Sequence, residues 1–532
     1  MITFFALTPF IILLVLMVVL EKPAYISAPI TFFITLILSI YIWQMDAQWI
    51  LGSFVRSFSV TIEIMLIIFG AIFLLFALRS VGVFKPIEMM FQKVSTDSRI
   101  QAVIIGWFFV SFIEGIAGFG TPAMLAAPIL IALGFPIVLS VVITLIGDSV
   151  AVTFGAVGVP ITIGIAEGVG DTFPVAVSAL VVGETASLIH MLLSPIIPFI
   201  LILMVGINLG ISFRKNLQLW PFALVSGLLF TIPSYLVAKF LTPEFPSIIG
   251  ALVGGGIMIF LLRRGLFQPK ECYSYKKETL EETLSSNENG FSTKQIFKSL
   301  LPYILIIVLL LLTRLETFGF SEKLKSISFS IPDILNLPTS HELSILYSPG
   351  TIFIAVVFLG LFVGYINFTQ FRNSFQKSVY KIGLPFIGLL FVLAIVQIMI
   401  FSGNNLSGYE SMPMELAGSL TDLGSAWPFL APFVGVLGSF ISGSSTVSNL
   451  LFSTLQGTTA IATGLNVVLI LALQAVGSSI GNMVAIHNII AAQSAVGLSG
   501  KEGAILRKTL PTVLLYSTLA GIIGLVLSFF IF

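Results

Sequence analysis

Three carboxyl groups lie in otherwise apolar stretches of the sequence. Glu114 and Asp148 stand beside interruptions of such stretches, and Glu184 lies within the apolar run 174–190. An ionisable side chain inside a membrane is costly and usually functional, because a desolvated carboxyl can hold a proton at neutral pH and release it at an open face. We therefore predict that these three groups take part in proton coupling. The alternative for each is a hydrogen-bonded carboxyl that only ties helices together.

The chain has three histidines. His487 follows a polar interruption that begins at Gly481, and we predict that it joins the proton-coupling groups, with a satisfied packing residue as the alternative. His190 ends an apolar helix and His341 lies in a polar connection. We interpret both as structural.

Four further charged residues have weaker support as site residues. Glu63 lies in an apolar run without a neighbouring break, and Glu167 and Asp171 are expected in a loop. Arg56 begins a helix, where its long side chain can extend to the membrane surface. Attraction of an anionic substrate to the mouth of a pathway is the alternative for Arg56.

Two segments about 330 residues apart break apolar helices with small and polar residues, namely Ser111–Pro122 and Ser439–Asn449. In hydrocarbon, an unpaired backbone N–H or C=O is so costly that such breaks survive only when buried in protein or lining a watery cavity. A matching pair of breaks, one in each half, indicates the substrate site of a secondary transporter.

A helix that stops inside the bilayer presents unpaired N–H groups and the positive end of its dipole, which favours an anion. The alternative is close helix packing through small residues. The residues that we predict to bind substrate are Gly118, Gly120, Thr121, Ser444, Ser445, Ser448 and Asn449.

The two halves can be aligned through these breaks. Ser111 matches Ser439 at an offset of 328, and Gly147 matches Gly477 at an offset of 330. Chance matching in an apolar chain is the alternative, but the matches fall at the interruptions. We predict two inverted repeats, at about 22–212 and 350–532, whose re-entrant hairpins meet at the membrane midplane, with peripheral helices and a linker at about 213–349.

The composition is that of a membrane protein. Of 532 residues, 57% are hydrophobic and 9% are charged, with a mean hydropathy of +1.09, whereas soluble domains are about 25% charged. Apolar runs long enough to span a bilayer predict an all-α polytopic protein with about 12–15 transmembrane helices in a single transporter domain. The N-terminus lacks a basic region and a small-residue cleavage site, so we expect the first helix to remain. The single cysteine, Cys272, excludes an intramolecular disulfide.

Lysine and arginine mark the cytoplasmic loops of membrane proteins. The longest polar segment, 263–298, is rich in both and is predicted to be a cytoplasmic linker. The segment 403–425 has acidic residues but no lysine or arginine, so it should lie outside. Threading the spans through these loops places the N-terminus outside.

The segment Ser111–Ile161 resembles the signature region of the bacterial L-lactate permease family. So do Ser442–Asn449 and Ala495-Val496-Gly497-Leu498-Ser499-Gly500-Lys501-Glu502. The resemblance implies a bacterial cell-membrane symporter that couples protons to uptake of L-lactate, and often of D-lactate and glycolate, on a fold with re-entrant hairpins. The family commonly has Asp at the place of Ser445, which predicts a different local charge at the second break here.

These observations lead to a proton-coupled symporter of short monocarboxylates as the main hypothesis. A cation exchanger or channel, or a carrier of another small organic anion, is the alternative. An enzyme is not expected, because no His-Glu-x-x-His, Gly-x-Ser-x-Gly, Walker or dinucleotide-binding motif is present. The expected partners are a small carboxylate, the proton and the lipid bilayer, without nucleic acid, cofactor or metal, and a homodimer is a possible assembly.

Overall fold

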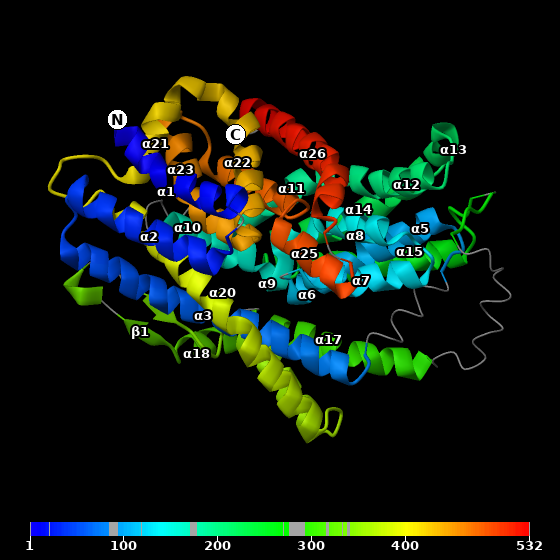
Figure 1. Ribbon diagram of the computed structural model, residues 1–532. Helices are drawn as coiled ribbons and strands as arrows, with labels where there is room; N and C mark the ends of the chain where they lie inside the picture. The colour runs from blue at the N-terminus through cyan, green and yellow to red at the C-terminus, as the bar shows by residue number, and fades with distance from the viewer. Residues whose placement is uncertain are drawn as a thin grey trace.

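The computed structural model describes residues 2–20, 22–83, 94–118, 120–170, 178–269, 271–275, 293–314, 319–331, 334–337, 341–498 and 500–530 (Figure 1). Nearly all of its elements are helices. Among the described residues, the one pair of named strands is antiparallel and short, β1 (Phe329–Ile331) with β2 (His341–Leu343). The predicted all-α membrane architecture is confirmed.

Ten described helices are long and apolar enough to cross a membrane, or eleven if the bent pair α11 (Ala179–Leu193) and α12 (Ile196–Asn208) is one span. This number is below the predicted 12–15 because several apolar runs fold into helices that are too short to cross. Those shorter helices are Ile2–Met17, Thr121–Ala132, Ile137–Asp148 and Pro349–Phe362.

Two helices of 34 residues, α3 (Ala47–Ser80) and α20 (Phe368–Phe401), form the centre of one layer. At 1.5 Å per residue each is about 50 Å long, which exceeds the roughly 30 Å of hydrocarbon. The Asp46 side chain caps α3, and a capping box of Asn367 and Gln370 starts α20. The same layer contains α1 (Ile2–Leu14) with η1 (Val15–Val19), α2 (Ala24–Tyr41), α17 (Thr293–Arg314), α18 (Phe320–Lys325), η7 (Ile334–Asn336) and α19 (Pro349–Phe362).

The first-half core is a series of short, interrupted helices. It contains α5 (Ser98–Val103), η2 (Ile104–Phe109), α6 (Val110–Ala117), α7 (Thr121–Ala132), α8 (Ile137–Asp148), η3 (Ala151–Phe154), α9 (Gly155–Val159), η4 (Pro160–Ile165) and α10 (Ala166–Val169), followed by α11 and α12. Three helices, α13 (Phe213–Leu217), α14 (Trp220–Phe240) and α15 (Pro246–Arg263), complete this side of the molecule.

The second-half core repeats the order of span, break, short helical hairpin and break. It contains α22 (Trp427–Ser442), α23 (Ser445–Ala462), α24 (Val467–Gly481), α25 (Ile486–Ala495) and α26 (Glu502–Phe530), preceded by α21 (Met412–Leu420) and η8 (Thr421–Ala426).

The glycines that the alignment paired occupy equivalent places in the two cores. A Cβ on Gly147 would overlap the Gly106 carbonyl, and one on Gly477 would overlap the Pro432 carbonyl. Each glycine lets its hairpin helix approach the backbone of the preceding span. The repeat boundaries and the inverted relation between the halves stay predictions.

Three basic loops, around Arg99, Lys215 and the start of the segment 263–298, converge in the structure. Arg99 forms a buried ion pair with Asp97 at 2.7 Å, and its Nη1 donates to Asn216 Oδ1 at 3.3 Å. Lys215 Nζ donates to Glu271 Oε2 at 2.7 Å and holds the pKa of that carboxyl below its ordinary value. In the segment 403–425, which is predicted to lie outside, the Glu410 carbonyl accepts a hydrogen bond from Trp43 Nε1. Residues expected on one side of the membrane therefore lie together.

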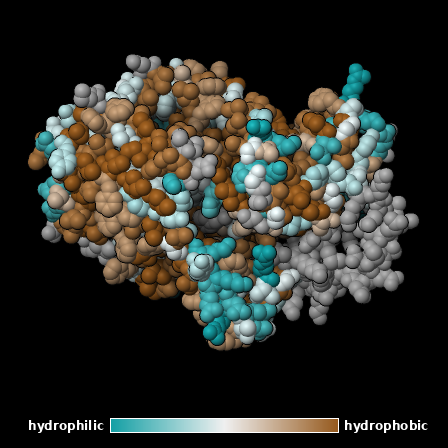
Figure 2. All heavy atoms as spheres, viewed as in Figure 1, coloured by the Kyte–Doolittle hydropathy of each residue, from teal (hydrophilic) through white to brown (hydrophobic). Residues whose placement is uncertain are grey.

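The surface has the apolar character that a lipid environment requires. In Figure 2, brown side chains cover most of the visible face, whereas teal polar residues gather at the projecting end of α20 and around α13. Both polar ends carry basic residues, including Lys377 in α20 and Lys215 in α13, as the cytoplasmic ends of membrane proteins do.

The predicted orientation places Cys272, which is exposed, on the cytoplasmic side next to Glu271. We expect a membrane-impermeant thiol reagent to label this single cysteine in inside-out vesicles and not in sealed right-side-out vesicles. A Cys272→Ser variant controls for non-specific labelling. Labelling of intact right-side-out vesicles would reverse the orientation.

Candidate functional site

The first break separates α6 from α7 at two glycines with positive φ. Gly118 has φ 55° and Gly120 has φ 74°, values that residues with a Cβ rarely adopt. The Thr121 backbone N–H and hydroxyl both donate to the Gly118 carbonyl, at 3.0 and 2.8 Å. The predicted helix interruption is therefore present, and Thr121 closes its turn.

The helices of the first hairpin are too short to cross the membrane. α7 and α8 have 12 residues each, or about 18 Å at 1.5 Å per residue, against roughly 30 Å of hydrocarbon. The turn between them is at an exposed surface around Gly134, whereas both far ends, at Gly120 and Asp148, are buried. The break and the carboxyl of Asp148 consequently lie inside the membrane region.

The second break separates α22 from α23. Gly443 has φ 74°, and the Ser444 side chain caps α23 by accepting from the Val447 N–H at 3.4 Å. Ser445 Oγ lies 2.6 Å from Ser478 Oγ, near the end of α24. The tip of the second hairpin is thus closed by serine hydroxyls.

The first turn of α25 contacts both breaks. A Cβ built on Gly443 would lie 2.9 Å from His487 Cβ, and one built on Gly120 would lie 3.1 Å from Asn488 Oδ1. His487 and Asn488 are consecutive residues, so the starts of α7, α23 and α25 meet in one place. The N–H groups of a helix's first turn have no acceptor within that helix, and the helix dipole makes this end positive. The arrangement suits an anion.

Two carboxyl groups are buried beside this meeting point. Glu114 is 4% exposed and Asp148 is 2% exposed. Glu114 Oε2 and Asp148 Oδ1 have no hydrogen-bond partner among the described residues. Two ionised carboxylates in such a place would repel each other, so at least one proton is needed to hold the pair.

The chain after Asp148 is unwound next to Glu114. Ala156 and Val157 have φ values of 44° and 59°, which cost free energy for residues with a Cβ. A Cβ on Gly155 would collide with Glu114 Oε1, and one on Gly118 would lie 2.9 Å from Ala156 Cβ. This strained segment packs directly against the first break, and periodicity in the sequence did not predict the strain.

Ser448 and Asn449 have protein partners in this structure. Ser448 Oγ donates to the Gly435 carbonyl and Asn449 Nδ2 donates to the Pro160 carbonyl, both at 2.8 Å. Gln474 Nε2 lies 3.2 Å from Ser448 Oγ and 3.4 Å from Asn449 Oδ1. These contacts join α23 and α24 of the second half to η4 of the first. Direct binding of substrate by the two residues stays a prediction.

Glu184 and His487 lie in different surroundings from the buried carboxyl pair. Glu184 is partly exposed and forms an ion pair with Lys239 of α14 at 3.2 Å. His487 is exposed, although its backbone position adjoins the second break. Their roles in proton coupling stay predictions.

Arg56 is a correction to the sequence interpretation. Its side chain does not extend to the surface but is 5% exposed, with Nη2 3.8 Å from Glu167 Oε2 and the guanidinium over the Phe401 ring. Glu167 belongs to the short helix α10 and not to a loop. Asp171 lies outside the described residues.

His190 is buried in a hydrogen-bonded group, as a structural residue would be. Its Nε2 lies 2.7 Å from Thr153 Oγ1 and its Nδ1 lies 3.0 Å from Tyr516 Oη. This group ties η3 and α11 to α26. His341 begins β2, which packs against α3.

Sequence reasoning missed two amides at the site, Asn482 and Asn488. Asn482 Nδ2 lies 3.5 Å from Asp148 Oδ2, and Asn488 approaches Gly120. Both stand in the polar stretch from Gly481 to Asn488 that had singled out His487. Two amides flanking a break inside an apolar run were the signal that could have found them.

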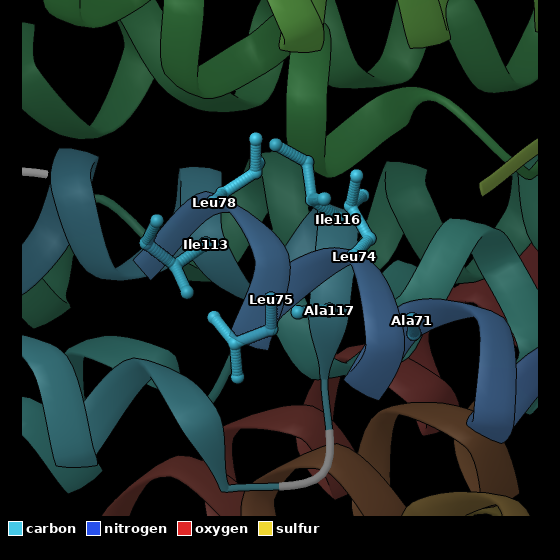
Figure 3. Close-up of a pocket in the computed structure, with 7 residues that line it drawn as sticks. All are labelled: Ala71, Leu74, Leu75, Leu78, Ile113, Ile116 and Ala117. Atoms are coloured by element: carbon cyan, nitrogen blue, oxygen red, sulfur yellow. The ribbon is translucent and has the colours of Figure 1, made fainter. Parts of the chain in front are cut away.

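An apolar crevice between α3 and α6 ends beside the first break (Figure 3). Its lining offers only hydrocarbon side chains, so polar contacts to a ligand at the break must come from the other side. The lining residues are Ala71, Leu74, Leu75, Leu78, Ile113, Ile116 and Ala117.

The model of the L-lactate permease family matches residues 3–531. The chain belongs to the L-lactate permease family. A putative L-lactate permease of Haemophilus influenzae is 31% identical, covering 97% of this chain and 96% of that protein. The L-lactate permease of Bacillus subtilis is 29% identical, covering 95% and 92%, and a glycolate permease of Escherichia coli is 28% identical, covering 98% and 95%.

Membership of the L-lactate permease family and the apolar helices together make this a multi-pass protein of the bacterial cell membrane. Among solved structures, the Neisseria gonorrhoeae efflux pump MtrF is similar over 90% of this chain and 84% of that one, with 12% identity and a TM-score of 0.42. That likeness is too distant to bear on mechanism.

The close packing of Gly155 on Glu114 leads to a prediction. Gly155→Ala places a methyl group against Glu114 Oε1, and overpacking of this kind costs about 1–3 kcal/mol. We expect uptake of labelled lactate into vesicles to fall about tenfold, because one tenfold step corresponds to ~1.4 kcal/mol. Gly256→Ala in α15, where an added Cβ meets nothing within 4 Å, is the matched control. Uptake by Gly155→Ala at the wild-type rate would show that the packing around Glu114 has no effect on transport.

Proposed function

We propose that this chain is a secondary transporter, and not an enzyme, that carries L-lactate or a related short 2-hydroxy monocarboxylate together with a proton. D-lactate and glycolate are the related substrates. The observation that carries the proposal is the meeting of three helix starts, α7, α23 and α25, beside the buried carboxyls of Glu114 and Asp148. The names of its relatives, L-lactate permease and glycolate permease, support the substrate class.

The electrostatics of the site favour binding of the proton and the anion together. Helix starts attract a carboxylate, but an ionised Glu114 or Asp148 nearby repels it. Protonation of the carboxyl pair removes that repulsion. The positive charge of the proton and the negative charge of the anion cancel, so binding both together adds no net charge to the site. The loaded site is therefore less charged than a site holding the anion alone, which lowers the cost of moving it through the membrane region.

Release on the other face follows the same logic in reverse. When the site opens to a side with low proton concentration, Glu114 or Asp148 ionises and the carboxylate is repelled. Two halves with matching breaks supply a structure that can open to either side around one site, which is the requirement for alternating access. The proposed cycle needs the two hairpins to keep their contacts at α25 while the layer of α3 and α20 moves relative to them.

Uptake of labelled lactate into proteoliposomes tests this function. With an imposed inward proton gradient we expect accumulation above equilibrium, which is lost when an uncoupler collapses the gradient. A sodium gradient of equal size should not replace it. Accumulation that follows sodium and ignores the proton gradient would overturn proton coupling, and absence of uptake for lactate and glycolate alike would overturn the substrate class.

Glu114→Gln is the matched variant for this experiment, because it keeps the shape of the side chain and removes its exchangeable proton. We expect counterflow of lactate to persist and uphill accumulation to disappear. If Glu114→Gln accumulates lactate as the wild type does, the coupled proton is carried by another group.

A further inference from the structure

Two amide side chains of the second half connect Asp148 with the first break. Asn482 Nδ2 donates to Asp148 Oδ2 at 3.5 Å, and Asn488 Nδ2 donates to Asn482 Oδ1 at 2.5 Å. The remaining amide atom, Asn488 Oδ1, faces Gly120, where a built Cβ would lie 3.1 Å away. All three polar side chains are at least nine-tenths buried. A hydrogen-bonded chain therefore runs from a carboxyl of α8 to the turn that starts α7.

The direction of this chain depends on whether Asp148 Oδ2 accepts or donates. An amide has a donor on one side and an acceptor on the other, and an ionised carboxylate can only accept. An ionised Asp148 therefore accepts a hydrogen bond from the NH2 of Asn482. The side-chain oxygen of Asn482 in turn accepts one from the NH2 of Asn488. The oxygen of Asn488 is left to face Gly120, as the structure shows. An amide oxygen at the break repels a carboxylate.

Protonation of Asp148 at Oδ2, the oxygen that faces Asn482, reverses every step. That oxygen becomes an O–H donor, which Asn482 can accept only after its amide makes a half turn, whereas a proton on Oδ1 would leave Oδ2 an acceptor. Asn482 then presents its NH2 to Asn488. Asn488 makes the same half turn to keep that bond and gives up the second bond of its Nδ2, to the Asn482 backbone carbonyl at 3.5 Å. The NH2 of Asn488 now faces Gly120. The only chemical change is one proton added to Asp148, and the break has exchanged an acceptor for a donor.

We propose that Asn482 and Asn488 form an amide relay that makes the first break attractive to a carboxylate only when Asp148 is protonated. The inference rests on the proposed function, since it needs a proton at Asp148 and a carboxylate beside Gly120. Because coupling between two ligands is reciprocal, a carboxylate bound to the Asn488 amide also favours the protonated form of Asp148. The relay thus supplies a specific link between proton and substrate, in addition to the simple repulsion between charges.

Few other charges face Asp148. Of the elements packed against α8, the helices α7, η2 and α12 carry no titratable side chain. α6 contributes Glu114, and α25 contributes His487, which is exposed. α26 contributes Tyr516, hydrogen-bonded to His190, together with Glu502, Arg507 and Lys508 in its first two turns. Glu114 is therefore the one buried carboxyl on these elements besides Asp148 itself.

The test is the pH dependence of lactate binding to the purified full-length protein, measured by isothermal titration calorimetry. For the wild type we expect affinity to fall by about tenfold per pH unit above the ionisation of the carboxyl pair, the limit for one proton bound with each lactate. Asn482→Leu removes the link and leaves Asn488 in place. We expect its affinity to fall less steeply with pH than that of the wild type, with substrate counterflow retained, because the repulsion between charges remains and the relay does not.

Asn488→Asp is the second variant, and it presents acceptor oxygens to Gly120 in the ionised state whatever the state of Asp148. We expect weak lactate binding at every pH at which the new carboxyl is ionised. Gln397→Leu is the matched control, because this amide of α20 is fully buried, has no hydrogen-bond partner among the described residues and lies outside the relay. It should keep the wild-type slope.

The outcomes separate the relay from the proposed function. A wild type without pH dependence of binding overturns proton coupling itself. A wild-type slope in Asn482→Leu overturns the relay and leaves the proposed function standing. If Asn482→Leu fails to assemble, Asn488→Asp decides, since wild-type lactate affinity in that variant also overturns the relay.

Discussion

A helix that ends inside a bilayer leaves backbone N–H groups without acceptors where no water can supply them, and this constraint shapes the whole molecule. Each break is closed locally, by the Thr121 hydroxyl at the first and by the Ser444 cap at the second. Packing shields the backbone groups that these local hydrogen bonds leave without a partner, because the first turn of α25 contacts both Gly120 and Gly443. Without that third helix the two breaks would face each other unsupported. The same exposed N–H groups that make the breaks costly make them suited to an anion.

The second consequence is that the halves of the chain hold each other's broken segments. Asn449 of α23 donates to the Pro160 carbonyl in the first half, and Asn482 after α24 reaches Asp148 in α8. The first bond ends on a backbone oxygen of the other half and the second on a carboxyl oxygen of the other half. Buried polar networks of this kind are unfavourable when partly satisfied and stabilising when complete. Two oxygens of this network, Glu114 Oε2 and Asp148 Oδ1, have no partner among the described residues, so the network is open to a change of protonation.

Sequence could predict what is encoded locally. Glycine clusters inside apolar runs located both breaks, and carboxyls beside interruptions located Glu114 and Asp148, because intramembrane charge and helix interruption are each visible in a short window. The alignment of Gly147 with Gly477 also corresponded to equivalent packing. Contacts between distant segments were out of reach. Asn482 meets Asp148 across 334 positions, and Arg56 is buried because α10 and α20 fold over it, which no window around Arg56 contains. The predicted number of spans exceeds the ten or eleven found among the described residues, because hydropathy measures apolar length and not where a helix ends.

The account depends on a carboxylate binding where the first turns of α7, α23 and α25 meet. The most direct test is a cryo-EM structure of the protein with lactate, prepared at a pH at which it transports. We predict density for the lactate carboxylate in contact with the backbone around Gly120 and Gly443, with Asn488 turned to donate. Lactate bound anywhere else, or first turns that are filled by the protein's own side chains when lactate is bound, would contradict the account.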